Sequence, residues 1–218
     1  MLAPGDVRNC VSALAEVDPV MGELLNFRFK DGSLKGHSLG NLFLAALNET
    51  SSSFDEAVKK FSHLTGVVGT VYPVTNESVT LSALLEDGRL IEGESHIGVH
   101  HDGPKNGIVK LMVNPEKPKA VDGVIKALEK ADIIVLGPGS LYTSIIPNLL
   151  VDGVVDAIKK SNAVKIYVCN IMSQAGETEN YTVSDHFAAI ERHSYEGIAD
   201  IVLSLIHISE PTRHLRIS

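Results

Sequence analysis

Residues 132–144 read Asp-Ile-Ile-Val-Leu-Gly-Pro-Gly-Ser-Leu-Tyr-Thr-Ser, an apolar run that ends in a glycine-rich turn. Short runs rich in Ile and Val are typical of strands that are buried on both faces of a parallel sheet. Comparable runs follow at 165–170 and 199–203, and helical patterns alternate with them. The expected helices cover residues 121–130, 151–160 and 184–193. This alternation predicts an α/β fold with a mostly parallel sheet and helices on both faces.

The first half of the chain divides into a helical part and a part with strand periodicity. The expected helices cover residues 7–16, 41–48 and 54–64, and Ser53 is a candidate N-cap of the last one. From residue 66 to residue 115 the apolar period changes to two, and the expected strands cover 67–72, 79–85, 90–97 and 108–113. Asp87-Gly88 favours a tight hairpin between two of them. This region therefore predicts an inserted antiparallel β layer.

The overall composition is that of an ordinary globular protein. Of 218 residues, 44% are hydrophobic and 21% are charged, and the formal net charge is −8. Nucleic acid is not an expected partner, because that binding needs clusters of Lys and Arg and the sequence has no basic cluster. No apolar run is long enough for a membrane span and no secretory signal is recognisable, so we expect no membrane partner and a cytoplasmic location. We expect Cys10 and Cys169 to be reduced thiols in the core.

The glycine-rich turn at 137–144 is the strongest candidate for a ligand site. It follows a buried strand, and open α/β sheets bind ligands at the carboxyl ends of their strands. Glycines let the backbone approach a ligand, hydroxyl groups can donate to phosphate oxygens, and a helix beginning near Thr143 would add an anion site. The alternative is a plain strand-to-helix turn with hydroxyl caps. The candidate ligand-binding residues are Gly137, Gly139, Ser140, Tyr142, Thr143 and Ser144.

A second turn, Gly36-His-Ser-Leu-Gly-Asn41, places polar groups just ahead of a hydrophobic helix. Such groups either cap the helix or contact a ligand. We take Gly36, Ser38 and Asn41 as candidate ligand-binding residues, with capping as the alternative role of Asn41. His37 is a catalytic candidate, although a single histidine in a turn is more often structural or exposed.

A third turn, Pro4-Gly-Asp-Val-Arg-Asn9, offers two further catalytic candidates. Asp6 either caps the helix that starts at Val7 or holds a metal ion, and no other residue is singled out as a metal ligand. Arg8 either pairs with a phosphate group or is a solvated side chain.

A fourth loop follows the strand expected at 165–170. Asn170 ends that strand and is a candidate ligand-binding residue, because loops at strand ends often carry function. Polar loop residues come after it: Gln174, Glu177 and Thr178. The polar residues near the start of the last expected helix are most simply caps and surface residues: Tyr181, Asp185 and His186.

Four motifs taken in this order resemble the gluconeogenesis-factor family. They are Pro-Gly-Asp-Val-Arg-Asn at 4–9, Gly-His-Ser-Leu-Gly-Asn at 36–41, Gly-Pro-Gly-Ser-Leu-Tyr-Thr-Ser-Ile with Pro-Asn-Leu-Leu at 137–150, and Val-Cys-Asn-Ile-Met with Gln-Ala-Gly-Glu-Thr at 168–178. The resemblance runs from Pro4 to Leu203. It implies a Rossmann-like fold and a cytoplasmic regulator that supports growth and cell shape on gluconeogenic carbon sources. It also implies binding of UDP-sugars, notably UDP-N-acetylglucosamine.

The resemblance leaves two hypotheses about function. In the first, the protein is a non-catalytic sensor that requires no cofactor: the turn at 137–144 cradles the diphosphate of a nucleotide sugar, Asn41 and Asn170 orient the sugar or base, and ligand binding changes the affinity for a cell-envelope protein. Homo-oligomers also fit the family.

In the second hypothesis, the protein resembles the related 2-phospho-L-lactate transferases, which move a phospholactyl group from a nucleotide-activated donor with the help of Mg²⁺. Asp6 would then lie near the metal, and Arg8 or His37 would stabilise negative charge on the phosphate. The sequence has no unambiguous base or nucleophile, which favours the first hypothesis.

The two ends of the chain depart from the family pattern. Members usually begin with a strand, a Gly-Gly-Gly-Thr-Gly loop and an Asp-Asp-Gly-Gly-Ser segment, and neither motif occurs here. Without that strand, we expect an unpaired sheet edge and poor solubility. Residues 204–218 resemble a translated adapter used in preparing sequencing libraries, so we expect a non-native tail, with a native strand and loop as the alternative. We therefore expect residues 1–203 to form one partial domain of the family.

Overall fold

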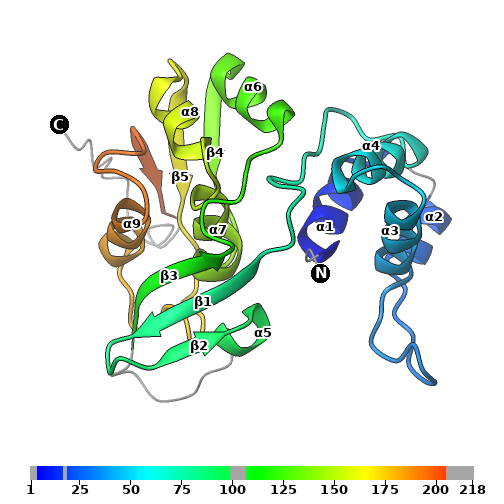
Figure 1. The fold of residues 1–218 in the computed structure, drawn as a ribbon, viewed down its shortest axis with the longest axis horizontal. Coiled ribbons are helices and arrows are strands. Elements are labelled where there is room, and N and C mark those ends of the chain that lie inside the picture. Colours follow the sequence, from blue (N-terminus) through cyan, green and yellow to red (C-terminus); the bar gives the residue numbers. More distant parts are fainter. Residues whose placement is uncertain (1–3, 17–18, 99–106, 205–218) are drawn as a thin grey trace. The chain divides into compact units, whose positions relative to one another are not determined.

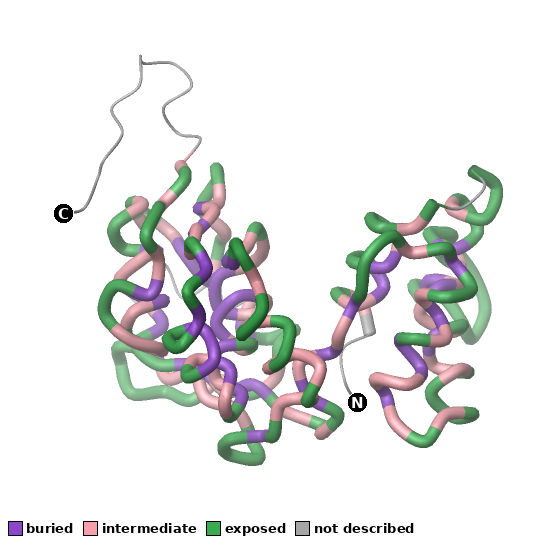
Figure 2. Tube along the Cα trace, turned by 90° about the horizontal axis from the view of Figure 1, so that it is seen from above, coloured by how far each residue is buried: buried purple, intermediate pink, exposed green. Residues whose placement is uncertain are grey.

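The computed structural model describes residues 4–16, 19–98 and 107–204. The chain forms two compact units, unit 1 (Met1–Ser78) and unit 2 (Val79–Ser218), which are described separately. Figure 1 gives the element labels, and Figure 2 shows buried residues in both units. The adapter-like tail lies outside the described residues from residue 205 onward. None of the helices in the described ranges has the length and apolar character needed to cross a membrane.

Unit 1 is built from helices, four of which fall in its described residues. They are α1 (Pro4–Leu14), α2 (Pro19–Asn26), α3 (Leu39–Glu49) and α4 (Phe54–Leu64). Buried side chains on α4 recur at the helical period, so one stripe of the helix faces the core. The core of the unit comprises Val11, Leu25, Leu44, Phe54, Ala57, Val58, Phe61 and Val71. The three helices expected in this part of the sequence are confirmed.

The strand expected at 67–72 is wrong. This segment is irregular, and its pairing consists of an isolated antiparallel bridge between Ala15 and Val67. Gly66 and Gly69 both have positive φ values, 61° and 100°, which interrupt an extended backbone. The alternating apolar pattern therefore reflects side chains that touch the helical core, such as Val71, rather than a sheet.

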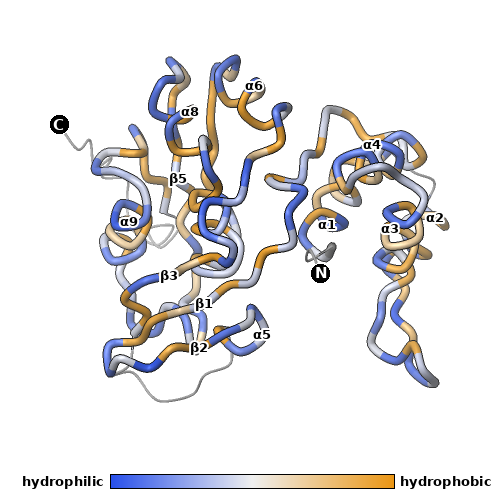
Figure 3. Tube along the Cα trace, viewed as in Figure 1, coloured by the Kyte–Doolittle hydropathy of each residue, from blue (hydrophilic) through white to orange (hydrophobic). Residues whose placement is uncertain are grey.

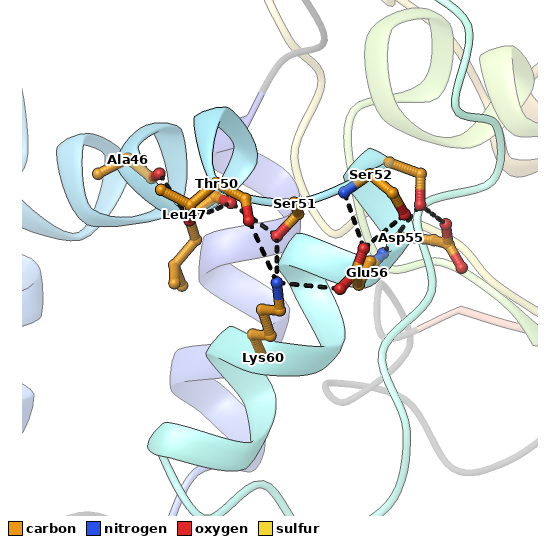
Figure 4. A network of polar contacts seen from close by, with 9 residues as sticks. Ala46, Leu47, Thr50, Ser51, Ser52, Asp55, Glu56 and Lys60 are labelled. Atoms are coloured by element: carbon orange, nitrogen blue, oxygen red, sulfur yellow. Dashed lines mark hydrogen bonds and ion pairs between the residues drawn. The ribbon is translucent and has the colours of Figure 1, made fainter.

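A network of polar contacts fixes the short connection between α3 and α4 (Figure 4). Ser53 caps α4 by accepting from the backbone N–H of Glu56, as the sequence predicts. The Glu56 carboxylate accepts from the backbone N–H of Ser52 at 2.8 Å, and Lys60 donates to the hydroxyl of Ser51 at 3.0 Å. Lys60 also pairs with Glu56 at 2.9 Å one turn earlier in the helix. These contacts satisfy polar groups after the end of α3 and at the start of α4, so they hold the connection between the two helices in one conformation.

Unit 2 begins with a three-stranded antiparallel sheet in the order β2-β1-β3. Its strands are β1 (Thr80–Leu85), β2 (Leu90–Glu92) and β3 (Ile108–Asn114). The hairpin expected at Asp87-Gly88 is confirmed, with Leu84 opposite Leu90. The strand expected at 90–97 is wrong in its second half, where α5 (Glu94–Ile97) forms instead, because Gly93 leaves the extended conformation with a φ of 93°.

The second sheet of unit 2 is parallel and has the strand order β4-β5-β6. Its strands are β4 (Ile133–Leu136), β5 (Val164–Val168) and β6 (Ile201–Leu203). Helix α6 (Asp122–Lys130) precedes β4, α8 (Val154–Lys160) lies between β4 and β5, and α9 (Val183–Arg192) lies between β5 and β6. This arrangement confirms an α/β fold that combines a parallel sheet with an antiparallel one.

One face of the parallel sheet is apolar and exposed. On β4, Ile133 and Val135 are 58% and 52% exposed, whereas the alternate residues Ile134 and Leu136 are buried. The register places further exposed aliphatic residues on the same face of the neighbouring strands: Val164, Ile201 and Leu203. Figure 3 shows how hydrophobic these strands are. We expected helices on both faces of the sheet. In the described part of the chain, the side chains of this face are more exposed than those of the opposite face. Large exposed apolar patches promote association.

Replacing Ile133 and Val135 by Thr should reduce association of the protein and leave the fold intact. Threonine keeps the β-branched shape that favours a strand, and both side chains already face solvent. Light scattering and binding of an apolar fluorescent dye should both decrease. In the control variant Ile134→Thr, which places a hydroxyl on the buried face, urea unfolding should show a loss of about 2 kcal/mol. Unchanged dye binding by the double variant would contradict this view of the exposed face.

Candidate functional site

The glycine-rich turn of unit 2 connects the end of β4 to a tight helical segment. That segment, η1 (Leu141–Ile145), is a π-helical turn and continues into α7 (Ile146–Leu149). Gly137 has a φ of 89°, and a Cβ there would lie 3.0 Å from the carbonyl oxygen of Val168 and 3.2 Å from Ile145 Cδ1. Glycine is therefore required where the turn passes the end of β5. The helical segment that we expected near Thr143 begins at Leu141.

A buried carboxylate joins this turn to the loop that follows β5. Glu177 is 3% exposed, and its carboxylate accepts from the backbone N–H of Tyr142 at 3.1 Å and from the hydroxyl of Thr143 at 3.2 Å. The side-chain amide of Gln174 donates to the same carboxylate at 2.9 Å. The hydroxyl of Ser140 in turn donates to Gln174 Oε1 at 2.9 Å. We call this set of contacts the Glu177 clasp. It holds together the loops at the carboxyl ends of two neighbouring parallel strands.

Several of the predicted ligand-binding residues meet at the clasp. The side-chain amide of Asn170 donates to the carbonyl oxygen of Gly139 at 2.7 Å, so the end of β5 supports the glycine-rich turn directly. The hydroxyls of Ser140 and Thr143, which we expected to face phosphate, donate to protein acceptors. The backbone N–H at the start of η1, where we expected an anion, is bound by the carboxylate of Glu177. The clasp therefore provides an internal anion at this helix start.

Tyr142 is fully buried and connects the turn to the antiparallel sheet. Its hydroxyl donates to the carbonyl oxygen of Ile108 in β3 at 3.1 Å and lies 2.9 Å from the hydroxyl of Tyr181. Burial, and then the hydrogen bond with Tyr181, raises the pKa of Tyr142. The ring also packs edge-on against His193. Tyr142 thus positions the turn through its hydrogen bond to β3 and through the contact of its ring with His193 at the end of α9.

Two histidines belong to α9: His186, which we expected at a cap or on the surface, and the C-cap His193, which the sequence did not single out. His186 is 3% exposed and packs edge-on against Tyr181, so the expectation of a surface residue is wrong for His186. Thr182 and Asp185 form a capping box at the start of the helix, which confirms a capping role for Asp185. The signal that could have found the histidines is their helical spacing, because His186 and His193 flank the buried pair Ala189 and Ile190 on one face.

His193 is held in its neutral form between α9 and the edge of β3. Its Nε2 accepts from the backbone N–H of Leu111 at 2.8 Å, so the other ring nitrogen, Nδ1, carries the proton and donates to the carbonyl oxygen of Ala189 at 2.7 Å. Burial lowers the pKa of His193 below its ordinary value of 6.5, and the charges of Arg192 and Lys110 lower it further. Protonation would break the bond to Leu111, since Nε2 could no longer accept.

The protein should become less stable as the pH falls below 6.5, the ordinary pKa of histidine. The folded state keeps His193 neutral, so below that pH the unfolded chain binds more protons and stability decreases until the lower, folded-state pKa is passed. The replacement His193→Gln should flatten this part of the profile, measured as urea unfolding against pH. If the stability of His193→Gln fell with pH as steeply as that of the parent protein, groups other than His193 would cause the loss of stability. His63→Gln, at an exposed histidine on α4, is the matched control.

The replacement Glu177→Gln should destabilise the protein by about 2 kcal/mol, because hydrogen bonds to a charged group are lost and an amide N–H₂ group is placed among donors. Urea unfolding measures the change. Glu196→Gln, at an exposed position of the same unit, should be close to neutral. Equal effects of the two replacements would show that the clasp does not contribute to the stability of the fold.

The candidate residues of unit 1 lie around α1 and the start of α3. Helix α1 begins at Pro4, so Asp6 lies in its first turn and is not the N-cap that we expected. Ser38 is the N-cap of α3 and accepts from the backbone N–H of Asn41 at 3.2 Å, so Ser38, not Asn41, supplies the capping group. Gly36 and His37 are exposed in the preceding turn.

Two expectations about buried and exposed residues of α1 are wrong. Arg8 is 6% exposed, which rules out the alternative of a solvated side chain. Cys10 is exposed, whereas Cys169 is buried as expected, and both are free thiols. Asp6, Cys10 and the buried Val11 share α1, but the helix turns Cys10 away from the core that holds Val11.

The described residues do not assemble a metal site by themselves. In ranges 4–16, 19–98 and 107–204, no three or more His, Cys, Asp or Glu side chains are grouped so as to hold a metal ion. Mg²⁺ is bound in proteins through carboxylates together with substrate phosphates and water. Asp6 is an exposed carboxylate in the first turn of α1, and its role as a metal ligand stays a prediction.

Comparisons with known proteins place the chain in a family. The model of the family described as 2-phospho-L-lactate transferase CofD matches residues 1–216. The gluconeogenesis factor of Halalkalibacterium halodurans is 46% identical over 203 residues, which are 92% of this chain and 61% of that protein. The gluconeogenesis factor of Bacillus subtilis is 43% identical over 203 residues, again 92% of this chain and 62% of that protein. The chain therefore belongs to the CofD family and, within it, to the gluconeogenesis factors.

Solved structures agree with this placement. A crystal structure of a protein from Bacillus halodurans matches with a TM-score of 0.88 at 44% identity, over 92% of this chain and 64% of that one. A relative from Clostridium acetobutylicum is 47% identical, and this chain covers 45% of its length. The chain thus spans between 45% and 63% of the length of three curated relatives, those from Clostridium acetobutylicum, Thermoanaerobacterium thermosulfurigenes and Halalkalibacterium halodurans.

Proposed function

We propose that the chain is part of a cytoplasmic regulator that binds a nucleotide sugar, UDP-N-acetylglucosamine, and supports growth and cell shape on gluconeogenic carbon sources. Membership in the gluconeogenesis-factor group supports the regulatory role. Ligand binding would change the affinity for a cell-envelope protein, and the protein would act without a required cofactor. Homo-oligomers would be compatible with this role.

The observation that carries the proposal is the joining of two strand-end loops by the Glu177 clasp. Ligands of open α/β sheets bind outside the carboxyl ends of the strands, where such loops meet. Gly137 and Gly139 let the turn pack closely against Val168, Ile145 and Ser144, and this packing would hold the backbone of the turn in place for a diphosphate. Asn170, already bonded to Gly139, is placed beside the same backbone. Contacts of Asn41 and the turn at 36–41 with the ligand remain predictions.

The alternative function is a metal-dependent transferase of a phospholactyl-type group from a nucleotide-activated donor. The description of the matching family model favours it. Asp6 would then contribute to binding Mg²⁺, and Arg8 or His37 would stabilise negative charge on the phosphate. We rank this alternative second, because the sequence has no unambiguous base or nucleophile.

Calorimetric titration of UDP-N-acetylglucosamine into the protein tests the proposal. We expect saturable binding that does not need Mg²⁺ and that Gly137→Ala weakens at least tenfold, since a Cβ at Gly137 would meet the backbone of β5 at 3.0 Å. Gly139→Val, which would meet Ser144 Cβ at 3.2 Å, should weaken binding as well. The same titration on the longer Halalkalibacterium halodurans relative provides a reference.

A control separates loss of the site from loss of the fold. Gly197 has a φ of 75° and no atom within 4 Å of its would-be Cβ, so Gly197→Ala imposes similar backbone strain away from the turn. It should bind the ligand as the parent does. Absence of binding in both proteins, or turnover that requires Mg²⁺ and is abolished by Asp6→Asn, would favour the transferase.

A further inference from the structure

Arg8 on α1 is a buried arginine whose hydrogen-bond partners among the described residues are neutral side chains. The residue is 6% exposed. Its Nη1 donates to Asn26 Oδ1 at 2.7 Å, and its Nη2 donates to Asn9 Oδ1. Both acceptors are side-chain amides, so they satisfy two N–H groups and leave the positive charge of the guanidinium uncompensated.

No ion pair within the described residues includes Arg8. The pairs found there are Lys59–Asp55, Lys60–Glu56 and Arg89–Asp87. A buried charge without an opposite charge is strongly unfavourable. Burial lowers the pKa of Arg8, and the positive charge of Arg28 lowers it further, so a second guanidinium adds repulsion at this place. An anion would relieve both effects.

Arg28 and the start of α3 lie at the same place. Arg28 is paired with Ser38, the N-cap of α3, in an isolated antiparallel bridge, and its Nη1 donates to the carbonyl oxygen of Gly36 at 3.0 Å. A Cβ at Gly40 would lie 2.9 Å from Arg8 Cδ, so the stem of Arg8 packs against the first turn of α3. Two arginines and the positive end of an 11-residue helix therefore converge.

Hydrogen-bonding capacity at this place is left unused. Arg8 Nε and Asn41 Oδ1 are both buried and have no hydrogen-bond partner. Buried polar atoms of this kind are normally satisfied, and an exception is explained by strain, a bound water or a bound ion. A phosphate that retains one proton can accept from the guanidinium and also donate to an amide oxygen.

We propose that unit 1 contains a site for a phosphate group, formed by Arg8, Arg28 and the first turn of α3. The site is formed by residues of unit 1 alone, and phosphate binding to it does not require a nucleotide sugar at the glycine-rich turn. The ligand class is inorganic phosphate, whose dianion keeps one proton, or the monoanion of a phosphate monoester, because guanidinium groups bind such anions through paired N–H donors.

Backbone amide NMR on the full chain tests this proposal, with inorganic phosphate as the probe and sodium chloride at equal ionic strength as the reference. We expect saturable shifts at the amides of Gly40 and Asn41. The replacement Arg28→Gln should weaken the apparent affinity about tenfold. Arg28 is exposed, so this variant should fold even if replacements of the buried Arg8 do not. Arg192→Gln, which removes an exposed arginine of unit 2, should leave the affinity unchanged.

Each of the following results would overturn the proposal. The first is the absence of saturable shifts at Gly40 and Asn41. The second is equal affinity in the parent and in Arg28→Gln. The third is saturation by acetate while phosphate has no effect, which would assign the site to a carboxylate. Shifts confined to Gly137 and Gly139 would also count against it, whereas failure of nucleotide-sugar binding in unit 2 would leave the result at Gly40 unaffected.

Discussion

The hydrogen bonds of the Glu177 carboxylate are the constraint on which the arrangement of unit 2 depends. A carboxylate that is 3% exposed accepts from a backbone N–H and two side-chain donors that belong to two different loops. Parallel strands bring their carboxyl ends to one edge of a sheet, but they do not determine how the loops beyond that edge pack. Here one acidic side chain determines it, because its buried charge is stabilised only while both loops supply donors.

The clasp is supported by the antiparallel sheet. The backbone N–H of Tyr142 donates to Glu177, and its hydroxyl donates to the carbonyl oxygen of Ile108 at the start of β3. Farther along the same strand, the backbone N–H of Leu111 donates to His193. Side chains of η1 and of the C-terminal end of α9 therefore bond to the edge of β3 that does not pair with β1. Disturbing any of these bonds would move the glycine-rich turn.

Local features of this protein could be predicted from the sequence, and long-range ones could not. The helix at 54–64 with its cap at Ser53 agrees with α4, because period and capping act within a few residues. The strand expected at 90–97 failed where Gly93 turns the chain. The structure brings the candidate residues Ser140, Thr143 and Asn170 to one turn, but their partners do not follow from the sequence. Glu177 is 34 residues from Thr143, and nothing local marks it as buried. The burial of Arg8 likewise depends on packing against α3.

Hydrogen exchange at the backbone amide of Tyr142 tests the central claim most directly. If Glu177 holds this N–H in the folded state, the amide should exchange only through openings that unfold much of unit 2, and Glu177→Gln should accelerate its exchange selectively. The amide of Met172, in the same loop region but 79% exposed, provides the internal reference for an unprotected site. Exchange of Tyr142 as fast as that of Met172 would contradict the account, because the two loops would then not be held together by the clasp.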